Sequence, residues 1–194
     1  MVTNQYTKNI PFKDISLHLR DQYLDNFSVP PSPSKNTQQI GDMGYALIAK
    51  NIKWDCSDLT ELLGISLSTS RIFITNPHSI LPTHKDCVGE QLTIREWAIN
   101  IPLFNCDKGH NVWYNDSKEY DNHQRYSWPS AMLLEHPRPI ESYRERLDTI
   151  KLIRTDIFHG VDNSDNTNYR VVLSLRSDDN ISWTEMCERI DESF

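Results

Sequence analysis

The sequence predicts a mainly β protein with helices near both ends. From about residue 70 onward, short runs rich in β-branched and aromatic residues are separated by Pro, Asn and Gly, which is typical of short strands joined by turns. Before and after this stretch, apolar residues recur at helical spacing. No internal repeat and no long low-complexity tract interrupts this organisation.

A first helix is predicted within residues 10–27, where an apolar stripe follows the helical period. The stripe consists of Ile15, Leu17, Leu19, Tyr23, Leu24 and Phe27. The helix is expected to end before the proline-rich residues 29–33, because proline cannot continue a helix.

Two shorter helices are predicted on either side of the β region. Residues 57–64 suit one turn or two of helix, with Ser57 as the N-cap and Gly64 as the C-terminal stop. Ser182, followed three residues later by a glutamate, fits a capping box that opens a final helix toward Ile190.

Length and composition indicate one globular domain. The chain has 194 residues, 38% of them hydrophobic and 10% aromatic, which is enough for a buried core and argues against disorder. The formal net charge of -7 argues against nucleic acid as a partner, because a polyphosphate normally requires a basic surface. Oligomeric state is left open.

We expect a cytoplasmic protein without a membrane partner. The sequence has no apolar stretch of about 18 residues, and residues 1–12 lack the apolar run of a signal peptide. Its 4 cysteines show no zinc-like CxxC spacing and are expected to stay reduced.

Within the β region, residues 72–81 and 93–104 are predicted as strands with their loops. Residues 155–161 and 169–175 flank the polar loop 162–168, and this pattern predicts a hairpin.

Three side chains in this region form a candidate metal site. His84 and Asp86 are two residues apart on an extended segment, and His159 lies in a later β run. Two imidazoles and one carboxylate can occupy one face of an octahedral metal and leave three positions open, as in non-haem Fe(II) oxygenases. Taken singly, each residue is better explained as a loop, turn or core residue; Gly160, which allows close approach beside His159, favours the metal interpretation.

Arg170 opens an otherwise apolar strand, Val171-Val172-Leu173. A structural salt bridge is the plain explanation for a cation in this position. A cofactor carboxylate explains it better, because burying a charge without a partner is costly.

The combination resembles the Fe(II)/2-oxoglutarate-dependent dioxygenase superfamily over roughly residues 70–176. It has some likeness to aspartyl/asparaginyl β-hydroxylase-like and prolyl-hydroxylase-like members, through the run Arg95 to Leu103. The resemblance implies a double-stranded β-helix (jelly-roll, cupin-like) core at 70–176, supported by a helical and mixed N-terminal region, 1–69, and a C-terminal helix, 177–194.

The resemblance also implies roles for the site residues. His84, Asp86 and His159 would hold Fe(II), and Arg170 would pair with the distal carboxylate of the co-substrate 2-oxoglutarate. A planar guanidinium suits that task because it grips a carboxylate with two hydrogen bonds. The implied reaction is a hydroxylation with O2, in which succinate and CO2 are co-products.

Arg95 and Asn100 are further candidates for contact with the cofactor or substrate. In a regular strand they lie on opposite faces, so only one of them points inward, and the sequence does not decide which. Together with Glu96 and Arg176 they could supply opposite charges to a polar, amino-acid-like molecule or a peptide side chain.

Two functions of other classes remain open. A cupin-like module could bind a metal or a sugar without turnover, and a zinc-dependent hydrolase could use the same three ligands. Arg170 argues against both, because neither has a 2-oxoglutarate carboxylate to neutralise.

Overall fold

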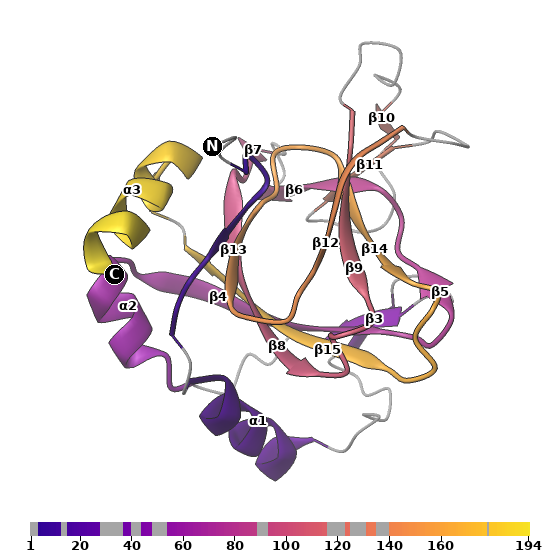
Figure 1. The fold of residues 1–194 in the computed structure, drawn as a ribbon, viewed down its shortest axis with the longest axis horizontal. Coiled ribbons are helices and arrows are strands. Elements are labelled where there is room, and N and C mark those ends of the chain that lie inside the picture. The colour runs from indigo at the N-terminus through magenta and orange to yellow at the C-terminus, as the bar shows by residue number, and fades with distance from the viewer. Residues whose placement is uncertain are drawn as a thin grey trace.

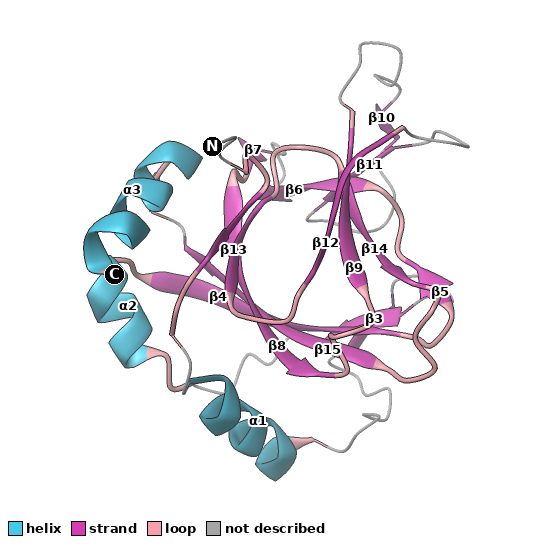
Figure 2. Cartoon of the chain, viewed as in Figure 1, coloured by secondary structure: helices cyan, strands magenta, loops and turns pink. Residues whose placement is uncertain are grey.

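The computed structural model describes residues 4–12, 15–27, 37–39, 44–47, 54–88, 93–115, 123–124, 131–134, 140–177 and 179–194. Two antiparallel sheets form a double-stranded β-helix (Figure 1). The helices α1 (Ile15–Asn26), α2 (Ser57–Leu63) and α3 (Trp183–Ser193) gather on one side of it (Figure 2). The predicted fold class is therefore confirmed. Among the described residues, no helix is long and apolar enough to cross a membrane.

The first sheet has seven strands. In spatial order they are β1 (Thr7–Asn9), β13 (Lys151–Arg154), β8 (Trp97–Phe104), β15 (Arg170–Ser177), β4 (Leu67–Thr75), β3 (Gly44–Leu47) and β2 (Thr37–Gln39). Three of these strands come from the N-terminal region 1–69, which therefore adds strands to the sheet as well as helices.

The second sheet has eight strands. Six follow the order β10 (His123–Gln124), β11 (Ala131–Leu134), β6 (His84–Val88), β14 (His159–Asn163), β9 (His110–Tyr114) and β12 (Glu141–Arg146). The short strands β5 (Ser79–Ile80) and β7 (Thr93–Ile94) pair with β14 and β6.

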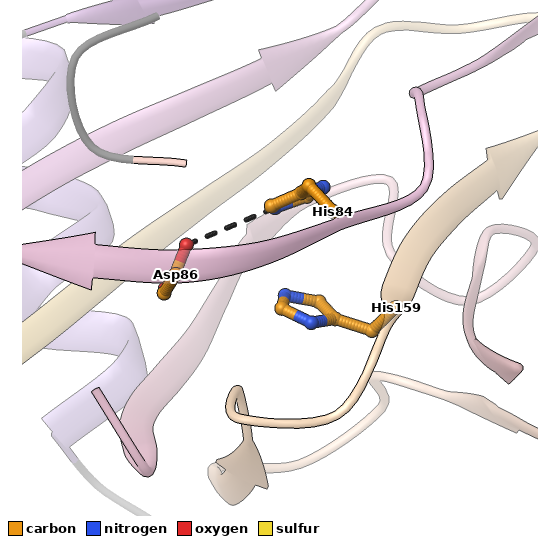
Figure 3. Close-up of side chains that lie close together, drawn as sticks. All are labelled: His84, Asp86 and His159. Atoms are coloured by element: carbon orange, nitrogen blue, oxygen red, sulfur yellow. Dashed lines mark ion pairs between the residues drawn. The ribbon is translucent and has the colours of Figure 1, made fainter. Parts of the chain in front are cut away.

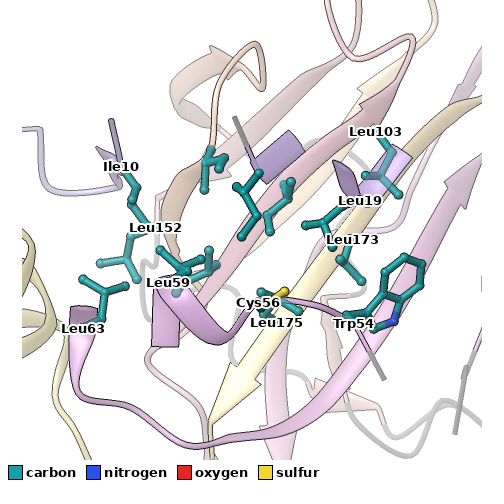
Figure 4. Packing of buried hydrophobic residues seen from close by; sticks show 14 of the residues in the cluster. Ile10, Leu19, Trp54, Cys56, Leu59, Leu63, Leu103, Leu152, Leu173 and Leu175 are labelled. Carbon is teal, nitrogen blue, oxygen red and sulfur yellow. The ribbon is translucent and has the colours of Figure 1, made fainter. Parts of the chain in front are cut away.

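The main hydrophobic core lies between the helices and the outer face of the seven-stranded sheet (Figure 4). On β15, Val171, Leu173 and Leu175 are buried in this core, while the alternate residues point into the space between the sheets. All eight residues of β15 are buried. One face of this strand therefore packs in the main hydrophobic core, and the other face lines the space between the two sheets.

The first helix packs with a narrower apolar face than the sequence predicted. Leu19 and Tyr23 are fully buried, but Leu17 and Leu24 are 61% and 52% exposed. The expectation that all members of the stripe pack inward is wrong for these two leucines. The proline-rich residues 29–33 lie outside the described residues.

The helix caps agree with the sequence in part. Gly64 ends α2 in the left-handed conformation, with φ of 60°, and Ser182 caps α3 by accepting a hydrogen bond from the Glu185 amide. The prediction of Ser57 as N-cap is wrong, because Cys56 holds that position and no side chain caps the helix. The Ser57 hydroxyl instead donates to Asp55.

The predicted hairpin is also wrong. β14 and β15 follow each other in sequence, but β14 belongs to the eight-stranded sheet and β15 to the seven-stranded sheet. Their connection, residues 164–169, crosses from one sheet to the other, so the two strands face each other across the interior of the β-helix. The predicted strand at 93–104 is divided into β7 and β8.

Candidate metal and carboxylate site

Three buried side chains meet on the inner face of the eight-stranded sheet. His84 and Asp86 lie two residues apart on β6, so they share one face of the strand, and His159 lies opposite His84 on the neighbouring β14. One ligand atom from each lies within 4.8 Å of the others, so the group could hold a metal ion. Figure 3 shows the three side chains pointing toward one another.

Both histidines present the same ring nitrogen to the group. The Nδ1 atom of His84 is 2.8 Å from the Pro82 carbonyl oxygen, and that of His159 is 2.9 Å from the Ile157 carbonyl oxygen. A carbonyl only accepts, so Nδ1 carries the proton in each ring and Nε2 keeps its lone pair. Backbone carbonyls two residues upstream thereby orient both rings so that Nε2 is the nitrogen available to a ligand.

The electrostatics keep both imidazoles neutral. Burial, followed by the effect of neighbouring His159, lowers the pKa of His84 to about 4. Burial also lowers the pKa of His159. Neutral imidazole is the form that binds a metal, so no proton has to leave either ring at neutral pH.

Asp86 is held by a guanidinium from the opposite sheet. The Nη2 atom of Arg176 on β15 lies 2.6 Å from Oδ2 of Asp86, and Oδ1 lies 3.8 Å from Nε2 of His84. Burial alone would raise the pKa of Asp86, but Arg176 and the histidines outweigh it, and the pKa falls below its usual range. One carboxylate oxygen therefore binds the arginine, and the other faces the imidazoles.

Removing this guanidinium should weaken metal binding. In Arg176→Met, Asp86 loses its buried charge partner, so its pKa should rise and its ionised form becomes less available to a metal. We expect about a tenfold weaker affinity for Mn(II), the typical effect of losing a group that supports a metal ligand. Titration with Mn(II) checks this, with Arg176→Lys, which keeps the charge, as the matched control. An affinity of Arg176→Met equal to wild type would contradict the supporting role.

A second polar feature of the interior is Arg170, the first residue of β15. Its Nη2 donates to Oδ1 of Asn111 on β9 at 2.9 Å. Its Nε is buried without a hydrogen-bond partner among the described residues. Burial lowers the pKa of Arg170, yet arginine stays charged in proteins. A buried cation whose hydrogen-bond partner among the described side chains is a neutral amide favours an anionic ligand.

One pocket joins the two features. It is lined by Phe73, Leu81, His84, Asp86, Asn100, Asn111, Ile153, His159, Val161, Arg170, Val172, Ser174 and Arg176. The candidate metal ligands and the candidate carboxylate-binding arginine thus face a common space between the sheets.

The structure settles which face of β8 points inward. The register from Trp97 to Asn100 against β13 is regular, so the two residues lie on opposite faces. Asn100 lines the pocket, and its buried Oδ1 has no hydrogen-bond partner among the described residues. Trp97 packs in the main core on the other face.

Two charged candidates, Arg95 and Glu96, immediately precede β8. Arg95 precedes β8, is half-buried and is absent from the described lining of the pocket. Its backbone amide donates to the Asp86 carbonyl, and its charge is one of those that lower the pKa of Asp86, so Arg95 lies close to the site. Glu96 accepts a hydrogen bond from the Trp183 amide at the start of α3, and it is absent from the described lining of the pocket.

Sequence reasoning missed the roles of Arg176 and Asn111. The sequence predicts that Arg176 offers its charge to a substrate, whereas in the structure Arg176 pairs with Asp86. A signal existed for Arg176, because it shares strand parity with Arg170 and so must face the same side. No sequence signal pointed to Asn111.

Comparisons with known proteins concern the fold. No family model matches the sequence, and no curated protein matches it. The structure is similar to that of AviO1 from Streptomyces viridochromogenes Tue57, with a TM-score of 0.51 and 12% identity over 90% of each chain. At this identity the likeness supports the fold alone.

Two weaker similarities carry no argument about this chain. EvdMO1 has a TM-score of 0.49 and 12% identity, over 88% of this chain and 46% of that one. HygX from Streptomyces hygroscopicus, in a structure with nickel, 2-oxoglutarate and hygromycin B bound, has a TM-score of 0.42 and 7% identity, over 91% of this chain and 83% of its own.

Proposed function

We propose that the protein is an Fe(II)- and 2-oxoglutarate-dependent oxygenase that hydroxylates a small polar, amino-acid-like molecule or a peptide side chain. The observation that carries the proposal is one pocket that combines a two-histidine, one-carboxylate group with a buried arginine that has no carboxylate partner among the described residues. This donor set is the one that non-haem Fe(II) oxygenases use. The buried Nε of Arg170 suits a carboxylate ligand.

When bound, Fe(II) would supply the site for O2 activation, with 2-oxoglutarate as the co-substrate: one oxygen atom of O2 would enter succinate, with release of CO2, and the other would enter the hydroxylated substrate. The protein's own residues bind and orient. His84 and His159 would each offer Nε2, and Asp86 would offer the oxygen that Arg176 leaves available. Arg170 would bind the distal carboxylate of 2-oxoglutarate.

The pocket walls would exclude water from this chemistry. Phe73, Leu81 and Val161 contribute apolar surface to the lining. A low-polarity surrounding strengthens the interaction of Arg170 with a carboxylate and limits side reactions of the bound groups.

Arg170 also separates this proposal from its rivals. A zinc-dependent hydrolase or a binding module with the same three ligands would need no buried guanidinium facing the pocket. A titration that detects no binding of 2-oxoglutarate to the Mn(II)-loaded protein would favour one of these functions.

The substrate class is tested by succinate formation. We expect a polar amino acid or a peptide to stimulate succinate production, and oligonucleotides to leave it unchanged, because 20 basic residues are outnumbered by 27 acidic ones. The assay compares both substrate classes with purified Fe(II)-loaded protein and uses His159→Ala as the inactive control. Strong stimulation by an oligonucleotide that weakens steeply with salt would contradict the substrate class.

A further inference from the structure

Gly109 lies directly against the side chain of Arg170. It is a buried residue immediately before β9. A Cβ atom built on it would lie 2.7 Å from Cδ of Arg170 and 3.2 Å from Nε. The first distance is shorter than real Cβ atoms reach, so the arginine stem occupies the space that any other residue at position 109 would fill.

This glycine is needed for space and not for its backbone conformation. Among the described glycines, only Gly64 has a positive φ. Gly109 therefore has backbone angles open to other residues, and close approach of the arginine is what excludes a side chain.

The other neighbour of Gly109 cannot easily give way. The same Cβ position would lie 2.8 Å from Oδ1 of Asn163. That oxygen accepts a hydrogen bond from Nδ2 of Asn166 at 3.0 Å, while Nδ2 of Asn163 donates to the Asn76 carbonyl at 2.8 Å. Asn163 and Asn166 are both buried, so an added methyl group at position 109 has to be accommodated by Arg170.

Asn111 fixes the other end of the arginine. Two residues along the chain from Gly109, its Oδ1 accepts the hydrogen bond from Nη2 of Arg170 at 2.9 Å. Gly109 thus sets the path of the stem, and Asn111 sets the direction of the guanidinium. We call these two residues the arginine seat.

We propose that the arginine seat, Gly109 and Asn111, positions Arg170 and thereby sets the affinity for 2-oxoglutarate. This inference rests on the proposed function, in which Arg170 binds the distal carboxylate. Neither seat residue is proposed to bind the metal, so the seat acts on the co-substrate through Arg170. Displacing the guanidinium should cost about one hydrogen bond to a charged group, which corresponds to roughly tenfold in affinity.

The test is calorimetric titration of 2-oxoglutarate into Mn(II)-loaded protein, beside a separate titration of Mn(II). Gly109→Ala should raise the Kd for 2-oxoglutarate about tenfold and leave the Kd for Mn(II) unchanged. Lys108→Ala is the matched control, because Lys108 is the exposed neighbour in the same loop, and both affinities should stay at the wild-type values. If Gly109→Ala binds 2-oxoglutarate as wild type does, or loses Mn(II) affinity equally, the seat is overturned.

A double-mutant cycle separates positioning from general damage. In an Arg170→Met background, the residue that the seat positions is gone, so Gly109→Ala should cause no further loss of 2-oxoglutarate affinity. A full tenfold further loss in that background would overturn the seat. If Arg170→Met alone leaves the affinity for 2-oxoglutarate unchanged, both the proposed role of Arg170 and the arginine seat are wrong. If Arg170→Met weakens 2-oxoglutarate binding but Gly109→Ala does not, only the arginine seat is wrong.

A second variant keeps the test decisive if Gly109→Ala does not fold. Asn111→Ala adds no atoms and removes the acceptor for Nη2. It should also weaken 2-oxoglutarate binding about tenfold at unchanged Mn(II) affinity. Wild-type affinity in this variant would overturn the seat as well.

Discussion

Replacing His159 with alanine is expected to abolish turnover and to weaken metal binding by about a hundredfold or more, while the fold persists. Only three protein ligands would hold the metal, so losing one removes about a third of the protein's bonds to it; a hundredfold corresponds to about 2.7 kcal/mol. The measurements are Mn(II) affinity by titration and Fe(II)-dependent succinate formation. The same result is expected for His84→Ala and Asp86→Ala, because the three side chains converge on one point.

An exposed histidine serves as the control for this prediction. His18 lies on α1 at the surface, and His18→Ala should leave Mn(II) affinity and succinate formation unchanged. Circular dichroism should show the same strand content for both variants. If the protein that lacks all three predicted ligands still binds Mn(II) as tightly as wild type, the assignment of the metal site is wrong.

Arg170→Met is expected to raise the Kd for 2-oxoglutarate about a hundredfold, with little change in metal affinity. Without the guanidinium, the distal carboxylate of the co-substrate would be buried without a partner, at a cost on the order of 3 kcal/mol. The expected kinetic signature is a raised KM for 2-oxoglutarate.

Two variants sharpen this measurement. Arg170→Lys keeps a charge but loses the planar two-pronged contact, so its Kd should lie between those of wild type and Arg170→Met. Arg146→Met removes an exposed arginine on β12 and should bind 2-oxoglutarate as wild type does. An unchanged Kd in Arg170→Met would move the carboxylate contact to another group, with Arg176 next, since it also lines the pocket.

The sequence predicted the class of the fold and the residues that the structure brings together at the site. The alternation of short apolar runs with Pro, Asn and Gly predicted the β core, which is confirmed. Residue type and spacing predict that His84, Asp86 and His159 lie together, and the structure places them in one cluster. Their role as metal ligands stays a prediction, as does the role of Arg170 in binding a carboxylate.

Other features depend on contacts between distant strands and could not be predicted. Turn residues between β14 and β15 marked a reversal of the chain, but they do not indicate that the second strand joins the opposite sheet. Strand parity predicted that only one of Arg95 and Asn100 faces inward, but only the packing of Trp97 against the helices decides which. The pairing of Arg176 with Asp86 and the contact of Gly109 with Arg170 likewise require the folded chain.

The alternation along β15 limits how this protein could acquire new substrates during evolution. β4 and β8 pair with β15 on both sides, so inserting or deleting one residue between Arg170 and Arg176 would turn one of the two arginines away from the interior. On that side of the change, apolar side chains would leave the core and polar ones would enter it, so packing and the pocket would suffer together. Changes in substrate range are therefore expected to accumulate in the connections that leave the sheets, where insertions are tolerated, while β15 keeps its length and register.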